Sequence, residues 1–151
     1  MSWLKKLCHR LGVKKQENDQ SIIINTGNVI KNVVVQKGDV FIDGSRIESY
    51  KKNSNVFILI QGSVEGTVKI EGTAVIEGDV NGNAEAGLTL DCKNVMGDAK
   101  AKMGINCNDI QGNANAGMDI NANRIGGNAD ASMSIKAKTI KGKAKAGFSF
   151  N

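Results

Sequence analysis

Two consecutive stretches decide the fold, VMGDAKAKMGINCND at residues 95–109 and IQGNANAGMDINANR at residues 110–124. They align without a gap, and the same 15-residue unit extends from residue 80 to residue 151. Each unit begins with Val or Ile, carries Gly at its third place, and carries Ala at its fifth and seventh places. A fixed period of this kind is the signature of a repeat architecture.

Within each unit, apolar or small residues fall on every second place, which is the periodicity of a β-strand with one buried face. The step lengthens to three once per unit, as from Cys92 to Val95, so that an odd repeat keeps the same side chains inward. The ninth place shares this parity, and we expect its residues to point inward: Leu88, Met103, Met118, Met133 and Phe148.

Stacked as parallel coils, the units would place identical side chains on one another, and each coil would cover its neighbour. With only six aromatic residues, the chain needs a narrow interior. We therefore predict an all-β, single-domain parallel β-helix, or β-solenoid, with about 15-residue coils. It would span residues 22–151 in eight or nine coils, most regular over residues 80–151. An antiparallel meander with turns such as Lys93-Asn94 is the alternative, but its apolar face would stay uncovered.

Upstream of the regular repeat, segments 22–24, 29–35 and 40–47 have the pattern of short strands separated by Gly and Asn turns. Residues 48–55 have the composition of a polar loop. We assign residues 1–13 to a basic amphipathic N-terminal segment and residues 14–21 to a polar linker.

Composition narrows the class of protein. The 151 residues carry a net charge of +5, and no run of 18 apolar residues occurs. The N-terminus lacks the apolar stretch of a secretory signal, so we expect a cytoplasmic protein. Three cysteines are too few for a disulfide framework, and we expect free thiols. Cys92 and Cys107 occupy the same inward place in adjacent coils, close enough for a bridge if the backbone allows it. We favour the alternative, in which they act as small buried apolar residues like Ala122 and Ala137 of the next two coils.

Nothing in the sequence points to catalysis. Hexapeptide-repeat acyltransferases need a histidine on the coils, but the one histidine is His9. The acids of the repeat occupy different places, no Ser/His/Asp set or phosphate loop is present, and no Cys/His spacing suits a metal. We expect no enzymatic activity, no cofactor and no metal site.

The N-terminal segment has the pattern of a short interfacial helix. Apolar side chains would form one face and basic side chains the other, and these are the membrane-anchor candidates: Trp3, Leu4, Leu7 and Leu11, with Lys5, Lys6 and Arg10. We expect this segment to bind an anionic membrane surface, so that the protein is peripheral on the inner face of the cell membrane. The alternative is a helix that caps the first coil.

The other end of the repeat stops in mid-unit, after Phe148 and Phe150. The end of a solenoid is an unpaired strand edge, which invites association with a second copy. We expect the terminal coils to form an assembly interface, with Phe148 and Phe150 at one end and Ile22 and Ile24 at the other. The alternative is that the two phenylalanines fold over and plug the last coil.

Charge is uneven along the chain. In residues 64–91 the charged side chains are six acids and one base, Lys69. Residues 136–145, in contrast, carry a basic patch without an acid: Lys136, Lys138, Lys141, Lys143 and Lys145. This patch suits phosphate, an acidic protein or an acidic coil of a second copy. Specific nucleic-acid binding is not expected, because no aromatic residues are interleaved with the lysines.

The stretch IQGSVEGTVKIEGTAVIEGDVNGNAEAG, residues 60–87, resembles the Gly/Val-alternating turns of the bactofilins. The resemblance implies a right-handed β-helix that polymerises end to end without nucleotide into membrane-associated cytoskeletal filaments. Two function classes result. The first is a structural polymer of this kind. The second is a non-polymerising β-solenoid adaptor, of the type encoded by phages or mobile elements, that binds a protein partner through its charged faces.

Overall fold

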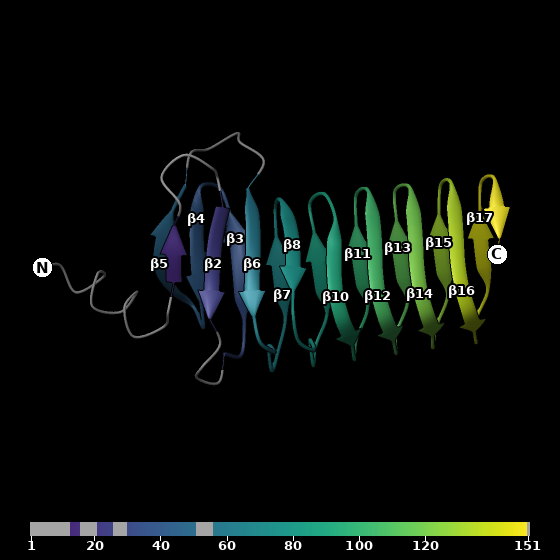
Figure 1. Ribbon diagram of the computed structural model, residues 1–151, viewed down its shortest axis with the longest axis horizontal. Coiled ribbons are helices and arrows are strands. Elements are labelled where there is room, and N and C mark those ends of the chain that lie inside the picture. Colours follow the sequence, from purple (N-terminus) through teal and green to yellow (C-terminus); the bar gives the residue numbers. More distant parts are fainter. Residues whose placement is uncertain (1–12, 16–20, 26–29, 51–55, 151) are drawn as a thin grey trace, which may run out of the picture.

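The 15-residue repeat folds as a stack of parallel β-coils (Figure 1). The structure is a computed structural model, and it describes residues 13–15, 21–25, 30–50 and 56–150. Strands form the regular structure of these residues, and none of them is helical. The predicted all-β parallel solenoid is confirmed, and the antiparallel meander is excluded for the repeat because its strands pair in parallel.

Two nine-stranded sheets run along the stack. The first, sheet A, contains in spatial order β1 (Val13–Lys15), β2 (Ser21–Asn25), β6 (Phe57–Gln61), β8 (Thr73–Ile76), β10 (Leu90–Val95), β12 (Gly104–Ile110), β14 (Asp119–Ile125), β16 (Ser134–Ile140) and β18 (Ser149–Phe150). The second, sheet B, contains β17 (Ala144–Ala146), β15 (Ala129–Ala131), β13 (Ala114–Ala116), β11 (Ala99–Ala101), β9 (Ala84–Ala86), β7 (Val68–Ile70), β3 (Val33–Gln36), β4 (Asp39–Ile42) and β5 (Ser45–Ser49).

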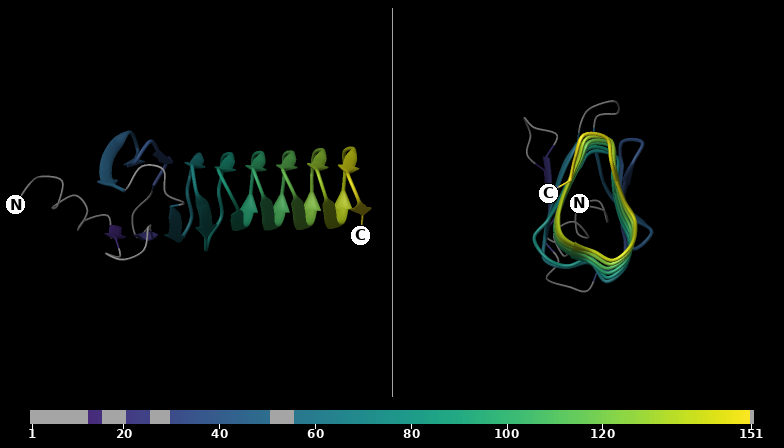
Figure 2. Two further views of the ribbon diagram at one scale, coloured as in Figure 1. Left: turned by 90° about the horizontal axis from the view of Figure 1, so that it is seen from above. Right: turned by 90° about the vertical axis from the view of Figure 1, so that its right-hand side faces the viewer.

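Viewed along its axis, the stack has a three-cornered outline (Figure 2). The third side is short and is held by isolated parallel bridges from Val64 to Val80 and from Val80 to Val95. Later coils absorb this side into the long strands of sheet A, where Val95 pairs with Ile110. The predicted step of three residues, from Cys92 to Val95, is the bend between sheet A and this third side.

The coils change length along the axis. Ile58 pairs with Ala74 and Ala74 with Leu90, a spacing of 16 residues, whereas Leu90 pairs with Ile105, a spacing of 15. An even number keeps strict alternation around the whole coil, which explains why the upstream sequence shows alternation without the three-residue step.

The first part of the stack departs from the coil pattern. Strands β3, β4 and β5 form an antiparallel meander, and β1 pairs antiparallel with β2. The strands predicted from segments 22–24, 29–35 and 40–47 are present, but β4 and β5 continue sheet B beyond β3 as a meander and add no coil. The stack therefore has about six turns, fewer than the eight or nine predicted. The predicted domain boundaries stay predictions, because residues 1–12 and 16–20 lie outside the described ranges.

The core is a set of ladders. Leu90, Ile105, Ile120 and Ile135 stack in sheet A, and the alanines of β9, β11, β13 and β15 stack in sheet B, all nearly inaccessible to solvent. Because sheet B contributes small side chains and sheet A large ones, the two sheets pack closely with few aromatic residues. Each fully buried Ile contributes roughly 1.5–3 kcal/mol of transfer free energy. Because this burial needs a neighbouring coil, each coil stabilises the coils next to it.

The ninth-place side chains do not point inward. Met103, Met118 and Met133 are 43%, 37% and 41% exposed, and Phe148 is 86% exposed. This place is the corner between sheets B and A, where the chain turns, so the alternation of a flat strand does not carry through it. The expected inward methionine ladder is therefore wrong, and these residues form an exposed apolar line instead.

Glycine occupies the corner before sheet B because successive coils approach closely there. The N–H of Gly112 donates to the carbonyl of Gly97 at 3.0 Å, and the same bond recurs between the other third-place glycines. A Cβ on Gly112 would lie 2.6 Å from that carbonyl oxygen. Next to it, an Asn/Asp ladder caps the backbone: Asn113 Oδ1, for example, accepts from the N–H of Asn128 at 2.9 Å.

We predict that Gly112→Ala lowers the free energy of unfolding by roughly 1–3 kcal/mol, because its methyl group forces two coils apart. Gly104→Ala is the matched control, since the nearest atom to its Cβ would be 3.8 Å away and other units carry Thr, Asp or Ser there. It should be neutral or slightly stabilising. Urea unfolding followed by circular dichroism measures both. Equal losses in the two variants would contradict the close-approach argument.

Candidate functional site

The outer surface of the coils holds the candidate functional features, and each outward place of the repeat becomes a row along the axis. In sheet B, the middle residue of each short strand points outward and pairs with its equivalents in the neighbouring coils. In the 15-residue coils these residues form what we call the sheet-B row: Glu85, Lys100, Asn115, Asp130 and Lys145. Glu85 is half-buried and the other four are exposed. Lys69 of β7 pairs with Glu85 from the preceding 16-residue coil and lies beyond the end of the row.

The second surface feature is the exposed apolar line at the corner that follows sheet B. We call it the methionine ridge: Leu88, which is half-buried, and the exposed Met103, Met118, Met133 and Phe148. Its backbone is held by coil-to-coil hydrogen bonds, such as Met118 N–H to the carbonyl of Met103 at 2.8 Å and Met133 N–H to the carbonyl of Met118 at 2.9 Å. These hydrogen bonds fix the backbone positions of the ridge, whereas its methionine side chains have several rotatable bonds and can change conformation.

The predicted basic patch lies on the last coil, and all five lysines are exposed. Lys136 and Lys138 are in β16 of sheet A, and Lys145 is in β17 of sheet B, with Lys141 and Lys143 between them. They therefore follow the last coil from sheet A to sheet B, and we call them the lysine collar. The residues one coil earlier are uncharged or acidic: Lys136 pairs with Asn121 and Lys145 with Asp130.

The assembly-interface candidates are separated. Phe148 lies at the end of the methionine ridge, and Phe150 is in β18, which pairs with β16. Ile22 and Ile24 are fully buried in β2, between β1 and β6, so their side chains face the core and no sheet edge. The membrane-anchor candidates, Trp3, Leu4, Leu7, Leu11, Lys5, Lys6 and Arg10, lie outside the described residues.

A groove of about 450 Å³ crosses sheet B where the meander meets the coils, lined by Tyr50, Lys69, Glu85, Lys100 and Lys102 among others. At its edge, the Tyr50 hydroxyl donates to Glu71 Oε2 at 3.1 Å, and the N–H of Lys37 donates to the same oxygen at 2.8 Å. Burial, reinforced by Glu71, raises the pKa of Tyr50. These two hydrogen bonds hold the meander against the coils, and we therefore assign the Glu71 carboxylate a structural role.

Among the described residues there is no metal-binding cluster, no membrane-spanning helix and no buried side-chain polar atom without a hydrogen-bond partner. No group of three or more His, Cys, Asp or Glu among the residues described lies close enough to hold a metal ion. Within the same residues, no helix has the length and apolarity needed to cross a membrane. Buried polar side-chain atoms there all have hydrogen-bond partners, so no orphaned group marks a ligand site.

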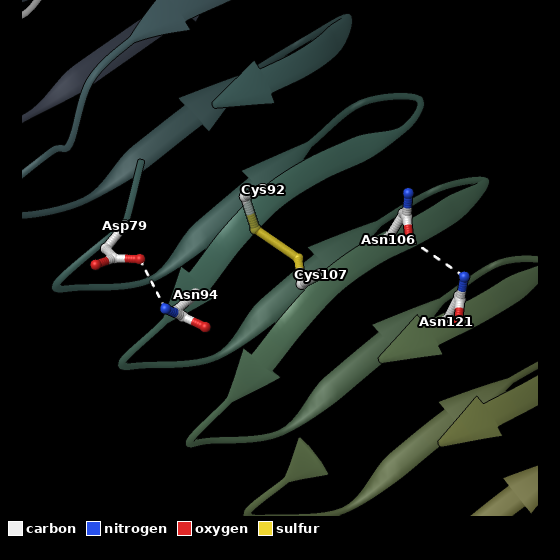
Figure 3. Close-up of a disulfide and its surroundings, with 6 residues drawn as sticks. All are labelled: Asp79, Cys92, Asn94, Asn106, Cys107 and Asn121. Carbon is white, nitrogen blue, oxygen red and sulfur yellow. Dashed lines mark hydrogen bonds between the residues drawn. A yellow bond between two sulfur atoms is a disulfide. The ribbon is translucent and has the colours of Figure 1, made fainter. Parts of the chain in front are cut away.

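A disulfide joins Cys92 and Cys107 (Figure 3), the pair that sequence reasoning placed within reach of a bridge but expected to be free thiols. Parallel pairing sets the two residues opposite each other in β10 and β12, with their Cα atoms 4.9 Å apart, inside the range that a disulfide spans. The expectation of free thiols is therefore wrong for this pair. Equal places in adjacent coils were the available signal, and it was outweighed by the resemblance of cysteine to the alanines of later coils.

Comparison with known proteins adds no relative: no protein-family model, curated protein or solved structure matches the chain. The parallel β-solenoid therefore rests on the repeat and on the structure, and the resemblance to bactofilins remains an interpretation of residues 60–87.

The disulfide closes a 15-residue loop and links two adjacent coils. We predict that it raises the free energy of unfolding by about 3 kcal/mol, which reduction removes. Urea unfolding with and without dithiothreitol measures the difference. The double variant Cys92→Ala/Cys107→Ala is the control, since later coils carry Ala122 and Ala137 at this place; reductant should not change its midpoint. An equal response in both proteins would contradict the cross-link.

Proposed function

We propose that this protein is a non-enzymatic structural protein, bactofilin-like, that assembles end to end through its terminal coils into filaments or scaffolds. The observation that carries the proposal is the strand edge of the last coil among the described residues. There, β17 and β18 are the outermost strands of the two sheets in the described part of the chain, and the core-facing side chain of Ala144 is exposed. The equivalent Ala129 is 1% exposed.

Backbone groups at this end are oriented for a further strand. The N–H of Ala114 donates to the carbonyl of Asn128 at 2.8 Å, and the N–H of Ala129 donates to that of Lys143 at 2.8 Å. Ala144 occupies the same place in β17, so its N–H points along the stack toward the position of a next coil. A strand edge of a second copy would supply the missing acceptor.

Charge favours a head-to-tail contact. Two collar-bearing ends would bring ten lysines together, five from each copy, which opposes their contact. At the opposite end of the stack, sheet B ends in β5. Because β5 is antiparallel to β4, and β4 to β3, β5 runs in the same direction as the coil strands of sheet B. Sheet A ends there in β1, which is antiparallel to β2. In a head-to-tail stack, β17 of one copy would therefore meet β5 of the next in the parallel sense of sheet B.

The test removes the donor at the edge of β17. We expect Ala144→Pro to leave the coils folded and abolish filaments, because proline has no N–H and no intramolecular acceptor is lost at an outermost strand. Ala144→Ser is the control, since it keeps the N–H. Negative-stain electron microscopy and light scattering measure assembly, and circular dichroism measures folding. Filaments that persist in folded Ala144→Pro would overturn the terminal contact.

We further propose that residues 1–13 attach the assembly to an anionic membrane surface, peripheral on the inner face of the cell membrane, with the coils in the cytoplasm. The support is the pattern of the N-terminal segment alone: apolar side chains on one helical face and basic ones on the other. A single short helix binds weakly, but an assembly presents many copies at once.

We predict that deleting residues 1–13 releases the protein from vesicles that contain anionic lipid while filaments still form. The measurement is co-sedimentation with vesicles of phosphatidylglycerol and phosphatidylcholine. Trp3→Glu in the full chain is the second variant, because a charge at the expected headgroup boundary should weaken binding without shortening the chain. Undiminished sedimentation of both variants would contradict the anchor.

One observation favours a second candidate function, a non-polymerising adaptor that binds a protein partner. The methionine ridge is an exposed apolar line beside a charged row, and such lines often mark protein contacts. A discrete small species in solution, with no filaments at any salt concentration, would favour this function over the structural one.

A further inference from the structure

The surface formed by the sheet-B row and the methionine ridge has an order of charges that reads oppositely from its two ends. Along the 15-residue coils the row is Glu85, Lys100, Asn115, Asp130 and Lys145, with one residue contributed by each of these coils in strict register; Lys69, one coil before Glu85, lies beyond it. The signs run negative, positive, neutral, negative, positive. Reversing the direction exchanges each acid for a base and leaves the central asparagine in place.

The ridge follows the same coils and shares their centre. Met118 lies three residues after Asn115, and the other four ridge residues lie three residues after the other four members of the row. Five coils at the strand spacing give the ridge a length of about 20 Å. Its residues are apolar, three of the five are methionines between 37% and 43% exposed, and Phe148 is more exposed still. Unbranched methionine side chains can adapt to a second copy of themselves.

We propose that two copies of this protein associate side by side and antiparallel, through sheet B and the methionine ridge. The twofold axis passes beside Asn115 and Met118. In this arrangement Glu85 faces Lys145 of the second copy, and Lys100 faces Asp130 of the second copy, each pair occurring twice by symmetry. On the ridge, Met118 meets its own copy, Met103 meets Met133, and Leu88 meets Phe148.

The occupant of the surface follows from charge complementarity. A parallel pair would place each charge of the row against its own kind, Glu85 on Glu85 and Lys100 on Lys100, which is repulsive. The antiparallel pair opposes every charge of the row by its opposite. Exposed ion pairs add little affinity individually, but they fix orientation and register. The contact is separate from the end-to-end contact proposed above and gives a structural protein a lateral association.

The register is tested by oxidative cross-linking in a Cys8→Ser background, in which Cys92 and Cys107 are already paired. Met118→Cys should form a disulfide-linked dimer, because it lies at the axis. Met103→Cys and Met133→Cys should each cross-link poorly alone, and a mixture of the two should give the heterodimer. The Cys8→Ser parent should give none. Equal yields from Met103→Cys alone and Met118→Cys would indicate random collision and overturn the proposal.

The charges are tested by reversal. Lys100→Glu should weaken the dimer by about tenfold, because repulsion from Asp130 replaces attraction in both symmetry-related pairs. Adding Asp130→Lys should restore it. Lys93→Glu is the matched control: the same change on β10 of sheet A, outside the surface, should have no effect. Sedimentation velocity measures association, and a loss of equal size in Lys93→Glu, or no rescue by the second change, would contradict the pairing.

Ala144→Pro separates the lateral contact from the end-to-end contact. In that background the Met118→Cys cross-link should still form, because the twofold axis lies two coils from β17. Filaments in the wild type without the Met118→Cys cross-link would overturn the lateral pair and leave the proposed function intact. The cross-link without filaments would do the reverse. If a different partner covers the ridge, neither the cross-link nor the charge rescue will appear.

Discussion

The hydrogen-bonded register between equivalent places of adjacent coils is the constraint on which the rest of the structure depends. Residue i pairs with residue i+15 over most of the stack, so Ile105 pairs with Ile120 and Asn115 with Asp130. A core place therefore becomes a ladder of like side chains, and a surface place becomes a row. Residues 15 apart in the sequence lie next to each other on the surface. The order of charged and apolar residues along a surface row can therefore be read from the sequence.

The same register explains why the narrow places of the stack are so restricted. Where a corner brings carbonyls of successive coils close, as between Gly97 and Gly112, only glycine fits, and the unit repeats it. The polar ladder at this corner also follows from the register. Asn128 Oδ1 accepts from the backbone N–H of Lys143, one coil later, just as Asn113 Oδ1 accepts from the backbone N–H of Asn128. Lys143 breaks this ladder, since an ammonium group accepts no hydrogen bond. Further stacking beyond the last coil has to rely on strand edges, not on this side-chain ladder.

The repeat predicted what depends on parity and failed where geometry is not strand-like. The ladders of Ile105 and Ala99 follow from alternation, and both are buried as expected. Met118 has the same parity but lies at a corner, and no pattern in the sequence distinguishes a turn of the coil from a straight strand. The disulfide was missed for a different reason: Cys92 and Cys107 were placed correctly, but cysteine and alanine fill a core place alike. Strands β4 and β5 match coil strands in composition, and only their pairing shows a meander.

A weak lateral contact and a weak terminal contact reinforce each other in a repeating assembly. One antiparallel pair has only the charges of a single sheet-B row and one short ridge, with Glu85 and Lys145 at its ends, so its affinity as an isolated dimer is modest. If copies join end to end as proposed, neighbouring filaments would meet through many such surfaces at once, and detachment would require breaking all of them. Because Asn115 at the centre is neutral, it carries no preference for direction. In the proposed assembly, the acids and bases on either side of it alone would therefore set adjacent filaments antiparallel.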